Sequence, residues 1–139
     1  MEPPQPGTVL VVDDSPLQRR QLSDMLQLLG YTHVEEAGSG QVALDRLVSP
    51  QSERPALVCL DLTLPDIPGF EVCEFIRSTP ELKDLPVLMI SARGQTLDRA
   101  QAEEAGASAY LIKPVTVESL RQQIERLMSA RTGKEAPSP

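Results

Sequence analysis

The sequence predicts one α/β domain, a doubly wound sheet of five parallel strands with five helices distributed over both of its faces. Short apolar runs alternate five times with segments whose apolar residues recur at helical spacing. The segments between successive runs are long enough to hold a helix, and parallel strands are joined by such crossover connections. The length of 139 residues is that of one ordinary domain.

The first strand and the first helix are marked by an abrupt change in residue type. Residues 8–12 are a β-branched, apolar run that stops at two acidic residues, which strands disfavour. Ser15 and Pro16 then suit the cap and the first position of a helix, and Gly30 suits its end. The apolar stripe of this helix is formed by Leu22, Met25, Leu26 and Leu29.

The same strand-and-helix cycle repeats along the rest of the chain. The remaining strands are expected at residues 32–37, 56–60, 86–90 and 107–112, and the remaining helices after Ser39, at 70–78, at 95–105 and after Thr116. The run at 32–37 is more polar than the others, which favours a place near an edge of the sheet. The runs at 56–60 and 86–90 are continuously apolar, as in strands that are buried on both faces.

The composition divides the chain into three segments. Residues 1–7 hold three Pro and one Gly, and we expect a disordered lead-in there. The folded domain is expected over residues 8–130, and residues 131–139 are expected to be a flexible tail or the start of a linker. The N-terminus lacks the basic and apolar regions of a signal peptide, and no apolar run reaches the roughly 18–20 residues of a membrane span.

Charge and composition exclude several functions. The chain has 13 Lys and Arg against 20 Asp and Glu, and its net charge of −7 would be repelled by nucleic-acid phosphates and anionic lipids. Aromatic residues make up only 3%, which leaves few platforms for stacking single-stranded bases. Cys59 and Cys73 form no disulfide framework, and two reduced thiols favour a cytoplasmic location. We therefore expect neither direct nucleic-acid binding nor membrane association.

Polar residues follow four of the five predicted strands. Asp13 and Asp14 follow the first strand, Asp61 the third, Ser91 the fourth and Lys113 the fifth. Each of these residues alone has a common structural role, the Asp and Ser residues as turn formers or caps and Lys113 as a solvated charge, but ligands of open parallel sheets bind at this carboxyl edge. The sequence therefore predicts three carboxylates, one hydroxyl and one ammonium at a single edge of the sheet.

This set of side chains suits magnesium-assisted phosphoryl chemistry. Carboxylates that lie close together repel one another, and a hard cation relieves that repulsion. Oxygen ligands with open positions for water and phosphate suit Mg²⁺. One carboxylate can then act as a nucleophile toward phosphorus, with Ser91 and Lys113 available to the phosphoryl oxygens.

At these motifs the chain resembles the receiver domain of bacterial two-component response regulators. The residues that carry the resemblance lie at 11–15, 60–65, 86–92, 106–107 and 110–114, in the family's order and each at a strand end. The resemblance covers about residues 8–129. It implies a flavodoxin-like fold with strand order 2-1-3-4-5.

The resemblance also implies how the acidic residues are used. Asp61 matches the phosphoryl acceptor of the family. Asp14 and Asp61 would ligate Mg²⁺ directly, together with the backbone carbonyl of Thr63, whereas Asp13 would act through water.

Further residues match the family's switch. Ser91 matches the hydroxyl that turns toward the phosphoryl group, and Lys113 matches the cation that pairs first with the acceptor and then with the phosphate. Tyr110 matches the aromatic residue whose ring becomes buried on activation. The Lys113–Pro114 bond is expected to be cis. Arg93, two residues after Ser91, would either screen the site or point to solvent.

The function implied is a phosphorylation-controlled switch of a two-component phosphorelay. A histidine kinase or phosphotransfer protein would supply the phosphoryl group, and the face formed by residues 95–126 would signal to a downstream protein or a fused output domain. The chain would be a phosphoryl acceptor rather than an enzyme, apart from slow self-dephosphorylation, and a monomer or weak homodimer.

Two alternative functions are also compatible with parts of this sequence. Phosphohydrolases of the haloacid dehalogenase type use a similar aspartate, Mg²⁺ and lysine, but they carry a second aspartate where this chain has Thr63. They also enclose their substrate with a cap insertion, which this sequence lacks. A phosphorylation-independent adaptor with the receiver fold would not need the complete set of polar residues.

Overall fold

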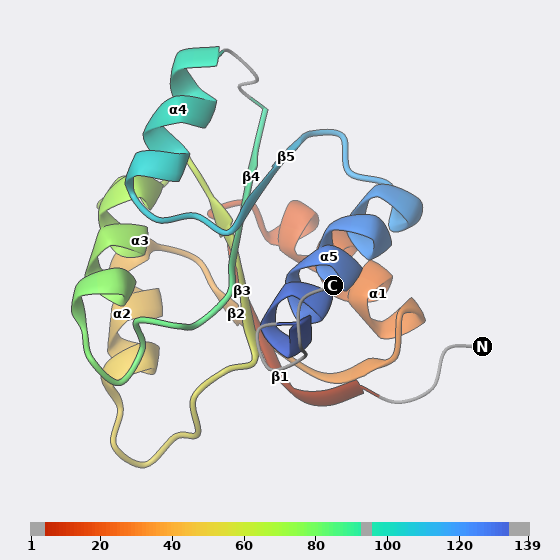
Figure 1. Cartoon of the computed structure of the whole chain (residues 1–139), viewed down its shortest axis with the longest axis horizontal. Coiled ribbons are helices and arrows are strands. Elements are labelled where there is room, and N and C mark those ends of the chain that lie inside the picture. The colour runs from red at the N-terminus through yellow and green to blue at the C-terminus, as the bar shows by residue number, and fades with distance from the viewer. Residues whose placement is uncertain (1–4, 93–95, 134–139) are drawn as a thin grey trace.

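Five strands alternate strictly with five helices in a computed structural model that describes residues 5–92 and 96–133 (Figure 1). The strands are β1 (Gln5–Val12), β2 (Tyr31–Ala37), β3 (Leu57–Asp61), β4 (Val87–Ser91) and β5 (Ala109–Ile112). The helices are α1 (Pro16–Leu28), α2 (Gly40–Val48), α3 (Gly69–Ser78), α4 (Thr96–Glu104) and α5 (Val117–Gly133). This is the alternation that the sequence predicts.

All neighbouring strands are parallel, in the order β2-β1-β3-β4-β5. Helices α1 and α5 cover one face of the sheet, and α2, α3 and α4 cover the other (Figure 1). The predicted fold class and the strand order are therefore confirmed, and β2 is an edge strand as its polar composition suggests. None of the described helices is long and apolar enough to cross a membrane.

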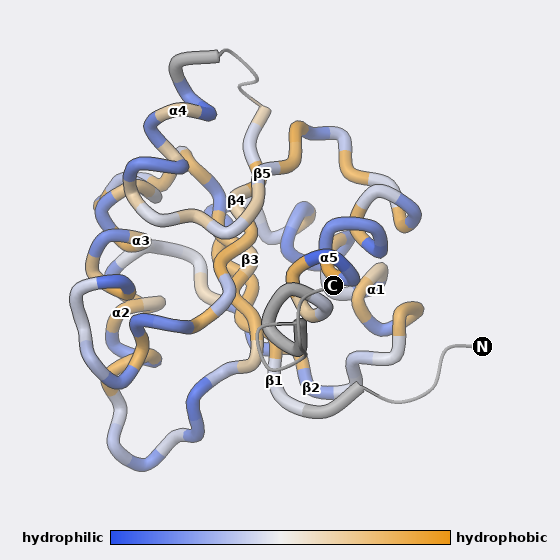
Figure 2. Tube along the Cα trace, viewed as in Figure 1, coloured by the Kyte–Doolittle hydropathy of each residue, from blue (hydrophilic) through white to orange (hydrophobic). Residues whose placement is uncertain are grey.

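The hydrophobic core lies on both faces of the central strands, which are the most apolar part of the chain in Figure 2. Along β1, Val9 and Val11 pack toward α1 and α5, whereas Leu10 and Val12 pack toward the opposite helices. Strands β3 and β4 are buried at every residue, as the two continuous apolar runs predict. Both cysteines are buried and free, and burial raises the pKa of Cys59 to about 12 and that of Cys73 to about 11.

Strand β1 begins earlier than expected. Residues 5–7, assigned to the disordered lead-in, belong to the strand, and Gln5 pairs with Tyr31 across an irregularity in register. Gly7 adopts a φ of 88°, a left-handed conformation that glycine tolerates. Pro6 lacks a backbone donor, but the pairing of β1 with β3 begins only at Val9, so no pair with β3 requires its N–H. Residues 1–4 lie outside the described residues.

The C-terminal helix is also longer than expected. Helix α5 runs to Gly133, so residues 131–133 of the predicted tail are helical, and residues 134–139 lie outside the described part of the chain. At its start, Thr116 and Ser119 exchange hydrogen bonds of 3.0 Å between each side chain and the other's backbone N–H. Such reciprocal capping satisfies two donors that the first turn of a helix leaves free.

Candidate functional site

Three carboxylates meet at the carboxyl edge of the sheet. The parallel register pairs Val12 with Leu60, so the residues that follow them, Asp13 and Asp61, lie side by side. One oxygen of each of Asp13, Asp14 and Asp61 lies within 4.8 Å of the others. Asp13 and Asp61 are only 6% and 7% exposed, whereas Asp14 is exposed. The cluster is thus buried on one side and open to solvent on the other.

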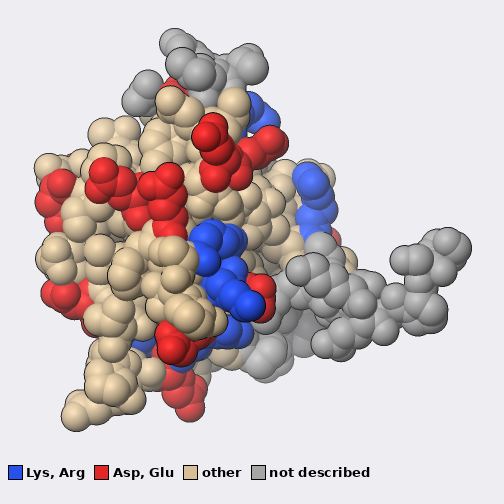
Figure 3. Space-filling model, turned by 60° about the vertical axis from the view of Figure 1, so that its left-hand side comes forward, with Lys and Arg blue, Asp and Glu red and all other residues tan. Residues whose placement is uncertain are grey.

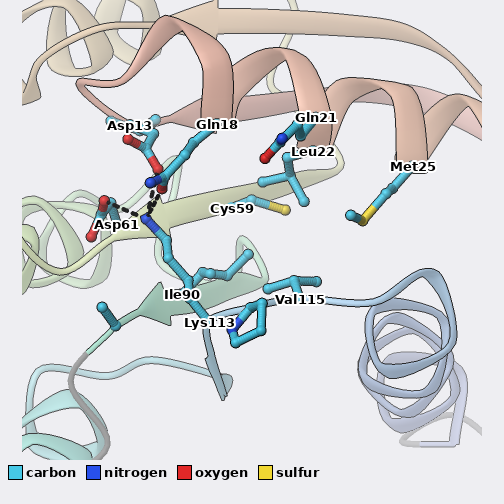
Figure 4. Close-up of a pocket in the computed structure, with 13 residues that line it drawn as sticks. Asp13, Gln18, Gln21, Leu22, Met25, Cys59, Asp61, Ile90, Lys113 and Val115 are labelled. Carbon is cyan, nitrogen blue, oxygen red and sulfur yellow. Dashed lines mark hydrogen bonds and ion pairs between the residues drawn. The ribbon is translucent and has the colours of Figure 1, made fainter.

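Lys113 reaches this cluster from the end of β5. Its Nζ atom lies 3.0 Å from Asp13 Oδ2 and 3.0 Å from Asp61 Oδ2, and it also donates a hydrogen bond to Gln18 Oε1 (Figure 4). The backbone N–H of Lys113 donates to the Ser91 carbonyl at 2.8 Å, which fixes its backbone to the end of β4. The peptide bond that follows Lys113 is cis, as the resemblance implies.

Backbone donors orient the two buried carboxylates. Asp13 Oδ1 accepts from the N–H of Ser15 at 2.9 Å, and Asp61 Oδ1 accepts from the N–H of Thr63 at 3.0 Å. Each aspartate therefore uses one oxygen in a local turn two residues ahead. The second oxygen of each is left facing Lys113.

The pKa values of Asp61 and Lys113 depend both on burial and on the charges nearby. Burial raises the pKa of Asp61, and the nearby Asp13 charge adds to this, although the Thr63 N–H and Lys113 act in the opposite direction. Burial alone would lower the pKa of Lys113, but hydrogen bonds and attraction from Asp13 and Asp61 raise it above its usual value. Lys113 is therefore a permanent cation at neutral pH, held against two carboxylates.

The donor set fits a hard divalent cation. Three carboxylates against one ammonium leave an excess of negative charge, and Mg²⁺ is bound through carboxylate oxygens together with water. The exposed position of Asp14 leaves one side of the cluster open to such waters. Thr63 lies next to the cluster, because its own N–H is bonded to Asp61.

The remaining predicted residues lie around this centre. Ser91 ends β4 and is buried, and β4 pairs directly with β3, the strand that ends at Asp61. Tyr110, on β5, is half-buried, and the guanidinium carbon of Arg99 lies 5.4 Å from its ring centroid. Arg93 lies outside the described residues.

Two site-related residues were missed by the sequence analysis. Asp66 accepts hydrogen bonds of 2.9 Å from the N–H groups of Gln41 and of Gly40, which lower its pKa and tie the β3–α3 loop to the start of α2. Gln18 binds Lys113 from the first turn of α1. Both contacts join segments that are far apart in the sequence. The presence of an Asp or a Gln at these positions does not by itself predict such a contact.

The chain belongs to the family of response regulator receiver domains, whose sequence pattern it matches over residues 9–125. Members of this family are the phosphorylation-controlled switches of two-component signalling, and the match does not favour the phosphohydrolase alternative. The resemblance stated from the motifs is thereby confirmed.

Similar proteins include regulators of two lengths. The response regulator MprA of Mycolicibacterium vanbaalenii is 39% identical over 127 residues, which cover 91% of this chain and 52% of that protein. The chemotaxis protein CheY of Pseudomonas aeruginosa is 32% identical over 125 residues, covering 90% of this chain and 98% of that one. The chain thus spans about half the length of the MprA relatives that it matches.

Solved structures share the fold. Chemotaxis protein CheY4 of Vibrio cholerae superposes with a TM-score of 0.80 at 31% identity, over 88% of this chain and 99% of that one. The Mn²⁺-bound form of the response regulator Rcp1 superposes with a TM-score of 0.73 at 27% identity, over 89% and 93% of the two chains.

Proposed function

We propose that Asp61 of this chain accepts a phosphoryl group and that the modification switches the signalling state of the domain. The observation that carries the proposal is the position of Asp61, a buried carboxylate that shares Lys113 with Asp13 and lies within 4.8 Å of Asp14. This arrangement joins a nucleophile, acidic metal ligands and a cation at one edge of the sheet.

In the proposed reaction an Asp61 carboxylate oxygen forms a bond to phosphorus. The bond from phosphorus to the donor's leaving atom breaks, and that atom keeps the electron pair. Bound Mg²⁺ would neutralise charge on the phosphoryl oxygens and on the acidic cluster. Its proposed ligands are Asp14, Asp61 and the Thr63 carbonyl, with Asp13 acting through water. Lys113 then donates to the phosphoryl group in place of the free carboxylate.

The switch follows from what the phosphoryl group contacts. We assign the Ser91 hydroxyl and the Lys113 ammonium as its reporters, and Tyr110 as the aromatic residue that changes its exposure. A phosphoryl group that binds these residues better in one conformation shifts the population toward that conformation. The face formed by α4, β5 and α5 is the proposed output surface.

The partners follow from the family and from the charge. We infer a histidine kinase or phosphotransfer protein as donor and a downstream protein or fused output domain as receiver of the signal, in the cytoplasm. Acidic side chains are spread over the face in Figure 3, and the net charge is −7, so direct nucleic-acid binding by this chain is disfavoured. We assign the receiver domain to residues 8–130, extended by the first residues of β1 and the last residues of α5, and propose that the chain is a monomer or a weak homodimer.

Beryllofluoride, which mimics a phosphoryl group on aspartate, tests the switch. With Mg²⁺ it should change amide exchange across residues 98–111 in the native chain. Ser91→Ala should still bind beryllofluoride but show less than about half of that change, because the hydroxyl that reports the phosphoryl group is gone.

Ser52→Ala provides the control, since Ser52 lies in the exposed α2–β3 loop at the other end of the sheet. This variant should respond like the native chain. No exchange response in the native chain would contradict the switch itself, and a full response in Ser91→Ala would contradict the role of Ser91.

A further inference from the structure

Lys113 has a third acceptor besides the two aspartates. An ammonium group has three N–H donors, and the described structure supplies oxygens from Asp13, Asp61 and Gln18. Gln18 is an exposed residue in the first turn of α1, and in Figure 4 its side chain extends over the end of the sheet toward Lys113. The ammonium is thus held from two sides, by charged groups on the sheet and by a neutral amide on a helix.

The start of α1 explains why Gln18 is available for this contact. Ser15 caps the helix and accepts from the Gln18 N–H at 3.2 Å, so the spacing of these two residues matches a capping box. In a capping box the glutamine side chain would bind the N–H of Ser15. Here Asp13 Oδ1 already accepts from that N–H at 2.9 Å, which leaves the amide of Gln18 to bind Lys113.

Packing does not fix the head of Lys113. A cavity of about 360 Å³ lies between α1 and the segment after β5, and Lys113 is part of its lining. Its other walls include the apolar side chains of Leu22, Met25 and Val115. With open volume beside it, the position of the ammonium depends on its hydrogen bonds.

We propose that Gln18 is a positioning residue that keeps the Lys113 ammonium beside Asp61 when a divalent cation occupies the acidic cluster. The inference rests on the proposed function. Asp61 is a proposed metal ligand and Asp13 is proposed to bind a metal-bound water, so a bound cation competes with Lys113 for the oxygens of both aspartates. Gln18 is neutral and is the acceptor for which the cation does not compete. It therefore keeps Lys113 ready to contact the incoming phosphoryl group.

The matched variants Gln18→Met and Gln21→Met test this inference. Both residues are exposed glutamines on α1 that line the same cavity. Lys113 donates a hydrogen bond to Gln18, whereas Gln21 is not bonded to it in the described structure. Methionine keeps the length and the helix propensity of glutamine and removes the acceptor. In saturating Mg²⁺, Gln18→Met should weaken beryllofluoride binding about fivefold, as expected for one lost hydrogen bond, and Gln21→Met should leave it unchanged. Thermal unfolding should show that both variants are folded.

A double-mutant cycle with Lys113→Met tests whether Gln18 acts through Lys113. The initial rate of Asp61 phosphorylation by acetyl phosphate should fall in Gln18→Met, yet Gln18→Met should cause no further fall in the Lys113→Met background. Equal behaviour of Gln18→Met and Gln21→Met, or an undiminished effect of Gln18→Met without Lys113, would overturn the inference. Failure of the native chain to bind beryllofluoride would instead overturn the proposed function.

Discussion

Replacing Lys113 with methionine should lower the free energy of unfolding by about 2–3 kcal/mol at pH 7 in the absence of divalent cations. The substitution leaves Asp13 and Asp61, which are 6% and 7% exposed, without the cation that binds both of them. Losing one partner of a fully buried pair costs more, but Lys113 is 20% exposed and water reaches the site. Urea unfolding in the presence of a chelator measures the loss.

The loss of unfolding free energy in Lys113→Met should be smaller at pH 5 than at pH 7. Burial already raises the pKa of Asp61, so its ionised form destabilises the fold above the ordinary carboxyl pKa, and acidification through the raised pKa relieves this. Without Lys113 that pKa rises further, so the variant should recover part of its stability between pH 7 and pH 5. The native contribution of Lys113, whose own pKa is raised, is lost only on strong alkalisation. Lys83→Met, at an exposed lysine, is the control, and an equal deficit at both pH values would contradict the explanation.

Magnesium should stabilise the native chain and raise its Tm by a few degrees. A cation that binds only the folded state adds about 1.4 kcal/mol when its free concentration is ten times its Kd. Asp14→Asn removes a proposed ligand and part of the repulsion in the cluster at the same time. This variant should therefore be more stable than the native chain without metal, yet gain little from Mg²⁺.

Thermal unfolding with and without Mg²⁺ at fixed ionic strength separates these effects. Asp84→Asn, at an exposed aspartate outside the cluster, should gain as much from Mg²⁺ as the native chain does. If Mg²⁺ shifts the melting of native chain and Asp14→Asn equally, the three carboxylates do not form the metal site.

The residues of the site could be predicted because in this fold they directly follow the ends of the strands. Parallel strands bring their carboxyl ends to one edge, so a residue that directly follows a buried apolar run has its place set by that run. Asp13 and Asp61 illustrate this, since their strands pair in register up to the residue before each. Lys113 follows the same rule at the end of β5.

Contacts made by loops and helix ends could not be predicted in this way. The sequence around Gln18 matches a capping box, and only the competing bond from Ser15 to Asp13 releases its amide to the site. Asp66 accepts a hydrogen bond at the start of α2 from a residue 26 positions earlier, and no local sequence pattern predicts that contact. The early start of β1 at Gln5 likewise depends on a partner, Tyr31, which composition does not identify.

The assignment of Asp61 as the phosphoryl acceptor is tested by measuring the intact mass of the chain after treatment with acetyl phosphate and Mg²⁺. The native chain should gain the mass of one phosphoryl group, Asp61→Asn should gain none, and Asp66→Asn, altered outside the acidic cluster, should be labelled like the native chain. Labelling of Asp61→Asn to the native extent would show that another residue accepts the phosphoryl group.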